Sequence, residues 1–173
     1  SRANEVHTIS ERLSKDFEIK FLSPEAKMDG GDIVYTGNGF LIGRSTRTND
    51  IGINELSKIA SKFGYSTQVI DVPSSTLHLT TVCSVPKNGM LIAAEGHLKP
   101  EQITGFDEVI WVPNSETYAS NTIAMENGIV LVSAGFPITK QRLETAGFET
   151  KEVEMGEIMQ ADGSLTCLSL FIG

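Results

Sequence analysis

One cysteine in this sequence stands where a folded protein could use it as a nucleophile. Cys167 follows a glycine turn in Gly163–Cys167 (sequence GSLTC) and opens an apolar stretch. Reactive groups are often presented where a turn meets a strand. Because a free cysteine is also a common small core residue, the alternative is that Cys167 only packs. Cys83 alternates with apolar neighbours inside Leu79–Val85, which favours a core position for that residue.

Such a nucleophile needs an acid/base, and His78 is the best placed of the three histidines. It lies between two leucines in Leu77–Leu79, whose side chains would point to the opposite face of a strand and leave the His78 ring on its own face. A core histidine with satisfied hydrogen bonds is the alternative. His7 falls on a predicted helix and His97 in a polar loop, so we expect both to face solvent.

An orienting carboxylate could come from Met28–Asp32 (sequence MDGGD), where two glycines separate Asp29 from Asp32. Paired glycines indicate a tight turn or a backbone that another group approaches closely, and a loop with two solvated acids is the alternative. Neither aspartate has a histidine nearby in the sequence, and no CxxC occurs, so we expect no metal site and no cofactor. A cysteine, a histidine and a carboxylate that meet would form a nucleophile, an acid/base and an orienting group.

The elements that must position these residues form a repeated unit. Its first copy has two short strands around Asn38-Gly39, a strong hairpin signal, then a helix that begins at Asn49-Asp50 and ends at Gly64, and a strand at Thr67–Val72. The order strand, strand, helix, strand returns at a spacing of about forty residues, which is typical of repeat architectures. The second copy has strands at Leu77–Val85, Met90–Ala94 and Glu108–Val112, with a short helix at Pro100–Thr104. The third copy has strands at Thr122–Met125, Ile129–Val132 and Glu149–Met155, with a helix at Pro137–Ala146.

Two half-units lie outside these copies: a helix at Asn4–Lys15 with a strand at Glu18–Leu22, and a strand at Gly163–Ile172. A repeat of this size indicates an array or closed ring, and an ordinary mixed α/β sheet is the alternative. Asp29, His78 and Cys167 each lie at the beginning or end of a module. In a ring these ends would come together at the centre, so the three residues would meet there. We expect residues 1–173 to form a single domain that lacks its N-terminal module or modules.

Charge and hydropathy exclude several classes of partner. The net charge of −8 disfavours nucleic acid and anionic membrane surfaces, whereas a cationic small molecule would be steered favourably. No apolar run is long enough to span a bilayer, and the first residues lack the apolar region of a signal peptide. Two cysteines are too few for a disulfide framework, so we expect a cytoplasmic protein.

Several motifs, taken in order, resemble the guanidine-modifying superfamily. They are Ser1-Arg2, the MDGGD segment, Gly43–Asn49 with its RTN, Leu77–Leu79 (LHL) and the GSLTC segment. The resemblance implies an α/β fold, a five-bladed pseudo-symmetric αβ propeller of ββαβ modules, incomplete in this chain. It also implies that Cys167 attacks a guanidinium carbon, that His78 protonates the departing amine and later activates water, and that Asp29 holds His78.

The resemblance further implies a substrate-binding set. Arg2 and Arg47 match basic positions that grip the substrate's α-carboxylate or its vicinity, a task that suits a bidentate guanidinium, and Ala161 would offer its backbone to the substrate amine. Arginine deiminases and amidinotransferases carry a carboxylate two residues after the histidine, where this chain has Thr80. The resemblance is therefore closest to the dimethylarginine dimethylaminohydrolases, which also lack that carboxylate.

The activity implied is hydrolysis of asymmetric dimethylarginine or monomethylarginine to L-citrulline and dimethylamine or methylamine through a covalent thiouronium intermediate. An arginine deiminase, another amidinohydrolase or amidinotransferase, and a catalytically silent propeller that only binds are the alternatives. The superfamily's guanidinium-binding carboxylates fall before the position of Ser1. We therefore expect this chain alone to be inactive, with a missing N-terminal segment or a homodimer partner completing it.

Overall fold

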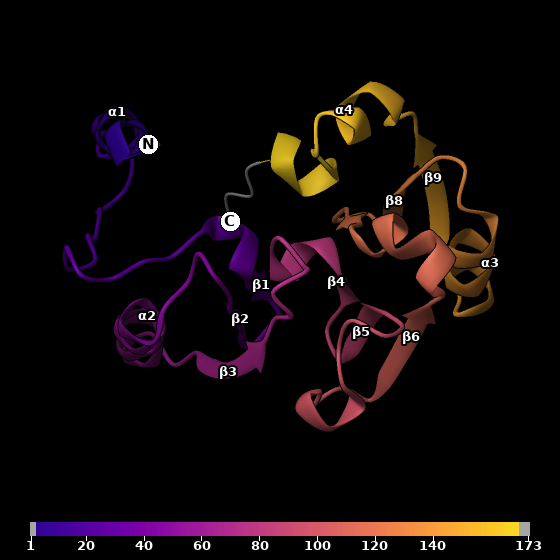
Figure 1. Cartoon of the computed structure of the whole chain (residues 1–173), viewed down its shortest axis with the longest axis horizontal. Helices are drawn as coiled ribbons and strands as arrows, with labels where there is room; N and C mark the ends of the chain where they lie inside the picture. The colour runs from indigo at the N-terminus through magenta and orange to yellow at the C-terminus, as the bar shows by residue number, and fades with distance from the viewer. Residues whose placement is uncertain (1–2, 170–173) are drawn as a thin grey trace.

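The structure of the protein is a computed structural model that describes residues 3–169. Three small sheets follow one another along the chain (Figure 1). In the first, β1 (Ile33–Tyr35) pairs antiparallel with β2 (Gly39–Arg44), and β2 pairs parallel with β3 (Ser66–Asp71) after helix α2 (Asp50–Lys62).

The next two sheets repeat the same order and pairing. The second contains β4 (Cys83–Lys87), β5 (Met90–Ala94) and β6 (Glu108–Val112), and the third contains β7 (Ile123–Ala124), β8 (Ile129–Ser133) and β9 (Glu149–Val153). Helix α3 (Pro137–Thr145) stands before β9, whereas the second module has only the 3-10 turn η3 (Pro100–Gln102) in the place of a helix. The predicted ββαβ order is thus confirmed in the first and third modules, and the short helix predicted at Pro100–Thr104 is a 3-10 turn. Figure 1 shows the three modules arranged along an arc, as in an αβ propeller.

Local sequence accounts for the ends of these elements. The Asn49 side chain accepts the N–H of Gly52 and begins α2, and Gly64 after that helix has φ of +82°, a conformation that glycine adopts without strain. Gly89 closes the turn between β4 and β5 with φ of +81°.

The hydrophobic core lies between neighbouring modules. Leu41 and Ile70 of the first sheet share one buried cluster with Leu91 and Ala93 of the second. A second cluster joins Ile92, Ile110 and Val112 to Val130, Val132 and Leu143 of the third module. Each module therefore buries its apolar residues against the next one, so that the start of each module is fixed relative to its neighbour.

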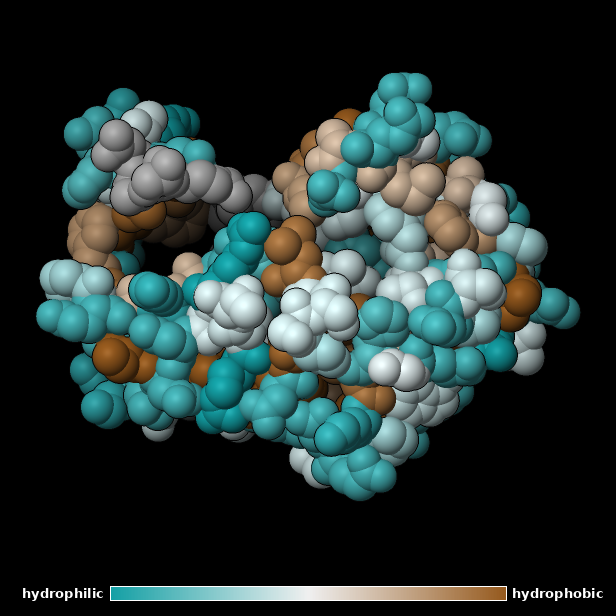
Figure 2. Space-filling model, in the orientation of Figure 1, coloured by the Kyte–Doolittle hydropathy of each residue, from teal (hydrophilic) through white to brown (hydrophobic). Residues whose placement is uncertain are grey.

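Helix α1 (Ala3–Leu13) lies apart from the sheets (Figure 1). Its apolar residues Val6 and Ile9 are 54% and 56% exposed. Figure 2 shows this lobe separated from the body by an opening, while the body itself carries mainly hydrophilic side chains on the face in view. Among the helices of residues 3–169, none is long and apolar enough to cross a membrane.

Three predicted strands are wrong in whole or in part. Glu18–Leu22 is irregular. Leu77–Val85 becomes a strand only at Cys83, after the 3-10 turn η2 (Leu79–Thr81). The described part of Gly163–Ile172 contains a 3-10 turn, η5 (Leu165–Leu168), in place of a strand.

Two backbone donors explain the departures beside the candidate residues. The N–H of Leu79 is bonded to the Asp32 side chain, and the N–H of Thr166 to the Asn121 side chain. In a β-ladder both N–H groups would have to bond to a neighbouring strand. Because side chains accept them instead, the backbone forms turns at these two places. The short helix α4 (Gly156–Gln160), just before η5, was not predicted.

Candidate active site

Asp29 and His78 lie together at the meeting point of the first and second modules. Asp29 precedes the 3-10 turn η1 (Gly30–Asp32), where its Oδ1 accepts the N–H of Gly31 at 3.3 Å. Its Oδ2 lies 3.2 Å from His78 Nε2, within ion-pair distance, but the two groups are not aligned as a hydrogen bond. The pairing of Asp29 with His78 is therefore mainly electrostatic in this state of the protein.

The surroundings of Asp29 favour its ionised form. Partial burial acts to raise the pKa of Asp29, but the hydrogen bond from Gly31, the neighbouring His78 and the Arg47 guanidinium outweigh it, so the pKa lies below its ordinary value of 3.8. An ionised Asp29 is the form that can hold an imidazolium at His78.

The absence of a side chain at Gly31 allows this arrangement. A Cβ at that position would lie 2.7 Å from Cγ and 2.9 Å from Nδ1 of His78, so the imidazole packs directly against the backbone of the turn. The His78 side chain is only 15% exposed. Of the two interpretations of the paired glycines in Met28–Asp32, the close approach of another group to the backbone is therefore correct at Gly31, where that group is the His78 ring.

Asp32 is fully buried, which rules out the alternative of two solvated acids. Its Oδ2 accepts the hydroxyls of Ser45 and Thr48, each at 2.6 Å, and its Oδ1 accepts the N–H of Leu79 at 3.0 Å. One carboxylate therefore joins the η1 turn to the loop after β2 and to the residue that follows His78. Sequence reasoning missed this role, and the position of Asp32 directly before strand β1 was the available signal.

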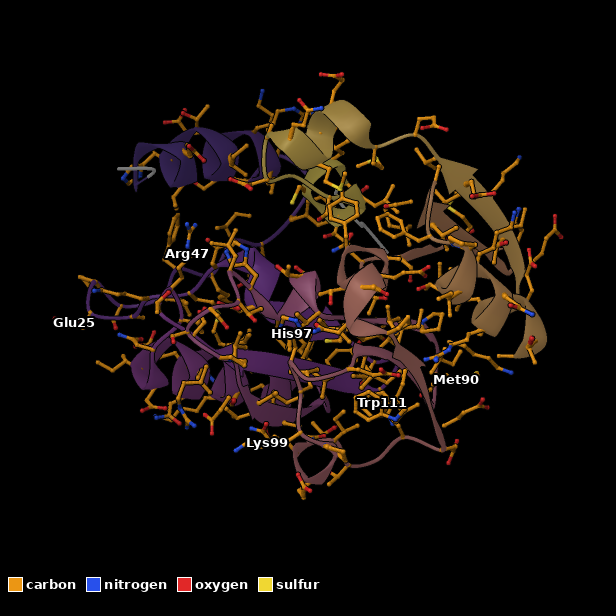
Figure 3. The ribbon with its side chains drawn as sticks, turned by 45° about the vertical axis from the view of Figure 1, so that its right-hand side comes forward. Glu25, Arg47, Met90, His97, Lys99 and Trp111 are labelled. Atoms are coloured by element: carbon orange, nitrogen blue, oxygen red, sulfur yellow. The ribbon has the colours of Figure 1, made fainter. Side chains whose placement is uncertain are left out.

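Arg47 reaches the same group of residues. One of its terminal guanidinium nitrogens (Nη1) lies 3.6 Å from Asp29 Oδ2, and its side chain is 45% exposed. Figure 3 shows Arg47 on the same side of the molecule as α1. Asp29 is therefore shared between a histidine and an arginine that solvent, or a ligand, can reach.

Cys167 lies on η5 and is exposed, whereas Cys83 is buried. Cys83 is fully buried, which confirms its core position. Burial raises the pKa of its thiol to about 12 and leaves it protonated at neutral pH. Cys167 Sγ lies 3.3 Å from the hydroxyl oxygen of Ser164. Of the two cysteines, Cys167 alone is accessible for chemistry.

The third module holds the turn that carries Cys167. Leu165 packs with Ile123 and Met155, and the Tyr118 hydroxyl donates to the carbonyl of Gly163 at 2.8 Å. Burial and the nearby Cys167 both raise the pKa of Tyr118 above its ordinary value of 10.0. Tyr118 therefore lies beside the cysteine as a neutral phenol.

The turn after His78 and the turn of Cys167 meet at Asn121, whose amide bonds to Thr80 and to Thr166. Sequence reasoning missed Asn121, because nothing in the polar run around it distinguishes it. The structure therefore brings Asp29, His78 and Arg47 into direct proximity, and it links Cys167 to them through this side chain.

The remaining candidates have other surroundings. Ala161 follows α4, is exposed, and donates its N–H to the carbonyl of Ile158, so the backbone group it can offer a ligand is its carbonyl oxygen. Arg2 lies outside the described residues. His7 is exposed as expected, but His97 is half-buried, because it packs against the segment that leads from β3 to η2 and bonds there to Thr76 at 3.1 Å. Within residues 3–169, no three His, Cys, Asp or Glu side chains gather as they would around a metal ion.

Successive ββαβ modules, with an aspartate–histidine pair where two of them meet and an accessible cysteine after the third, define a protein with the αβ-propeller fold of guanidine-modifying enzymes. Residues 12–117 match the family model described as arginine deiminase. The chain belongs to this family.

Curated relatives and solved structures agree with this assignment. The chain is 32% identical to an N(G),N(G)-dimethylarginine dimethylaminohydrolase of Pseudomonas aeruginosa and 27% identical to one of Streptomyces coelicolor, covering 98% of its own length in both cases. A solved structure of the Pseudomonas aeruginosa enzyme, a cysteine-to-serine mutant complexed with citrulline, matches with a TM-score of 0.87 and 31% identity over 98% of this chain. The amino-terminal domain of a cyanobacterial arginine dihydrolase, at 19% identity and a TM-score of 0.81 over 98% of this chain and 65% of its own, shares the fold.

The chain is shorter than these relatives. It spans 66% of the Pseudomonas aeruginosa enzyme, both as a sequence and in the solved structure, and 64% of the Streptomyces coelicolor enzyme.

Proposed function

We propose that the protein is a cysteine hydrolase that cleaves the guanidinium C–N bond of Nω-methylated arginine and releases L-citrulline with dimethylamine or methylamine. The observation that carries this proposal is the 3.2 Å approach of Asp29 Oδ2 to His78 Nε2. The turn after His78 is hydrogen-bonded through Asn121 to the turn that holds the accessible Cys167. The relative of known activity that supports it most directly is the Pseudomonas aeruginosa enzyme, which was solved with citrulline.

The proposed reaction has two halves, formation and hydrolysis of an intermediate on Cys167, and Cys167 and His78 act once in each. The thiolate of Cys167 attacks the guanidinium carbon and forms a C–S bond, while His78 in its protonated form gives its proton to the methylated nitrogen. The C–N bond breaks, the amine departs, and a thiouronium remains on Cys167. Neutral His78 then removes one proton from water, which attacks the same carbon. As the C–S bond breaks, the second proton of that water passes to solvent, which leaves neutral citrulline, the free thiolate and a protonated His78.

Asp29 supports both halves by its charge. As an ionised carboxylate beside Nε2 it stabilises the imidazolium that starts the first half and re-forms in the second. A guanidinium is a poor electrophile because its charge is delocalised, so positioning and proton transfer must supply most of the rate enhancement.

Substrate binding is proposed to involve Arg47, Arg2 and the carbonyl of Ala161. Arg47 is accessible, and within residues 3–169 its guanidinium makes one long ion-pair contact, at 3.6 Å, so it can turn from Asp29 to a substrate carboxylate without leaving a buried charge unpaired. The net charge of −8 attracts the cationic guanidinium group to the protein.

Arginine deiminase activity is the second candidate, and the family model favours it. Thr80 argues against it. The deiminases carry a carboxylate at this position, two residues after the histidine, and that carboxylate would bind the unsubstituted guanidinium nitrogens. The amine released separates the two, because a deiminase yields ammonia.

We also propose that an upstream segment, or failing that a second copy of the chain, completes the site. The exposed residues Val6 and Ile9 on α1 offer the apolar surface that such a segment would cover. This chain by itself is expected to be inactive, because the family resemblance assigns the guanidinium-binding carboxylates to positions before Ser1.

The test is product analysis with asymmetric dimethylarginine and with arginine as substrates, in this chain alone and in the chain extended by the proposed upstream segment, called the intact protein below. The proposal predicts equal amounts of citrulline and dimethylamine from the intact protein, no turnover by its Cys167→Ser variant, and none by the isolated chain. Ammonia from arginine at a higher kcat/KM would favour the deiminase. Turnover that survives Cys167→Ser would overturn the hydrolase proposal, and citrulline release by this chain alone would overturn the need for a further segment.

A further inference from the structure

The side chain of Asn121 joins the two turns that carry His78 and Cys167. Asn121 follows the 3-10 segment η4 (Asn114–Ser120) at the start of the third module and is 1% exposed. Its Nδ2 donates to the carbonyl of Thr80 at 2.7 Å and to the hydroxyl oxygen of Thr166 at 2.8 Å, and its Oδ1 accepts the N–H of Thr166 at 3.0 Å.

These partners are close in sequence to the reacting groups. Thr80 lies within η2, which begins directly after His78, and Thr166 immediately precedes Cys167. Within residues 3–169, the other contacts that hold the Cys167 turn stay in its own part of the chain: Leu165 packs within the third module, and Tyr118 binds Gly163. The hydrogen bonds of Asn121 therefore fix the turn after His78 and the turn of Cys167 relative to each other.

The chemistry of this junction calls for an amide. Two donors and one acceptor are used on one short side chain, which a carboxylate, a hydroxyl or an alkyl group cannot supply. Because the junction is buried, an unmatched group there cannot turn to water for a partner.

We infer that Asn121 is a positioning residue for the reaction, which sets the sulfur of Cys167 against the imidazole of His78. This inference rests on the proposed hydrolase function. The nucleophile and the acid/base must act on the same carbon from fixed directions, and a misplacement of about 1 Å can cost on the order of a hundredfold in rate. The hydrogen bonds of the Asn121 side chain go to Thr80 and Thr166 rather than to Asp29, His78 or Cys167, so the inference has it act through the two turns.

The experiment compares Asn121→Ala and Asn121→Asp with a control, Thr139→Ala, in the intact protein. Thr139 is fully buried at the start of α3 in the same module and bonds to Glu116, so its loss lowers stability without touching either turn. For N121A we expect kcat to fall by about tenfold or more with KM changed by less than about threefold, while T139A keeps its kcat.

N121D supplies a readout that loss of stability would not produce, and it keeps the inference testable if N121A fails to fold. Its ionised carboxylate would face the carbonyl of Thr80, and protonation would restore one donor. We expect its kcat, divided by that of wild type at the same pH, to rise as the pH falls.

Wild-type kcat in N121D at neutral pH, or an equal loss of kcat in N121A and T139A, would overturn the inference. Loss of activity in Cys167→Ser with unchanged activity in both Asn121 variants would overturn the inference alone. Activity retained in Cys167→Ser would instead remove the proposed function on which the inference rests.

Discussion

Replacement of Gly31 by alanine tests the aspartate–histidine pair without touching either residue. A Cβ at Gly31 would lie 2.7 Å, 2.9 Å and 3.0 Å from Cγ, Nδ1 and Cβ of His78. Ordinary contacts between carbon atoms are about 3.5–4.0 Å, so the imidazole would have to move by about 1 Å. The φ angle at Gly31 is not positive, and the effect therefore comes from the ring contact rather than from backbone strain.

The size of the effect follows from that displacement. A shift of about 1 Å between catalytic groups costs on the order of a hundredfold in rate, which is about 2.7 kcal/mol in the barrier. Overpacking of the His78 ring against the η1 turn adds a stability cost of about 1–3 kcal/mol. The assay is the steady-state release of dimethylamine from dimethylarginine by the intact protein, together with the urea midpoint of unfolding.

Gly30→Ala is the matched control. A Cβ at Gly30 meets nothing within 4 Å, and its φ is likewise not positive. We expect G30A to keep kcat within about twofold of wild type and G31A to lose it. Equal rates in the two variants would refute the claim that the position of the His78 ring on Gly31 matters for activity.

The remaining predictions concern buried groups. Asp32→Ala should lower the free energy of unfolding in urea by about 3 kcal/mol, because it leaves three donors unpaired, and a loss below about 0.5 kcal/mol would contradict the role given to Asp32. The pKa of Glu116 lies below its ordinary value of 4.5, because the hydrogen bonds from Thr139 and Ile138 outweigh burial. The advantage of wild type over Glu116→Gln in free energy of unfolding should therefore be constant above about pH 4.5 and shrink as the pH falls through the lower folded value; an advantage that grows on acidification would show that the sign is wrong. Iodoacetamide at about pH 8 should label Cys167 alone in the folded protein and also Cys83 in urea, because burial raises the pKa of Cys83 to about 12, and labelling of Cys83 in the folded state would contradict its burial.

The sequence predicted the modules well because their signals are local. Gly89 marks a hairpin turn, and Asn49 begins a helix whose end Gly64 marks, each by the backbone conformation that its residue type favours. The first hairpin also lies where the Asn38-Gly39 signal predicts it, although the glycine with positive φ there is Gly37 and Gly39 already begins β2. These features need no information about the rest of the fold, and the structure has them at the expected places.

The surroundings of the candidate site were predicted less well, because long-range hydrogen bonds determine them. The strand predicted across His78 gives way to a turn since Asp32, far away in sequence, takes the N–H of Leu79. The strand predicted across Cys167 is replaced by η5 since Asn121 takes the N–H of Thr166. Periodicity and propensity contain no term for such bonds, so the residues were found and their local geometry was not.

The measurement that tests the central claim most directly is acid quenching of the intact protein during turnover of asymmetric dimethylarginine, followed by mass analysis of its peptides. The account predicts an adduct on Cys167 equal in mass to the substrate less dimethylamine. His78→Ala should lower the rate at which this adduct forms, and Cys167→Ser should abolish it. Turnover with no adduct on Cys167, or the same adduct on another residue, would contradict the account.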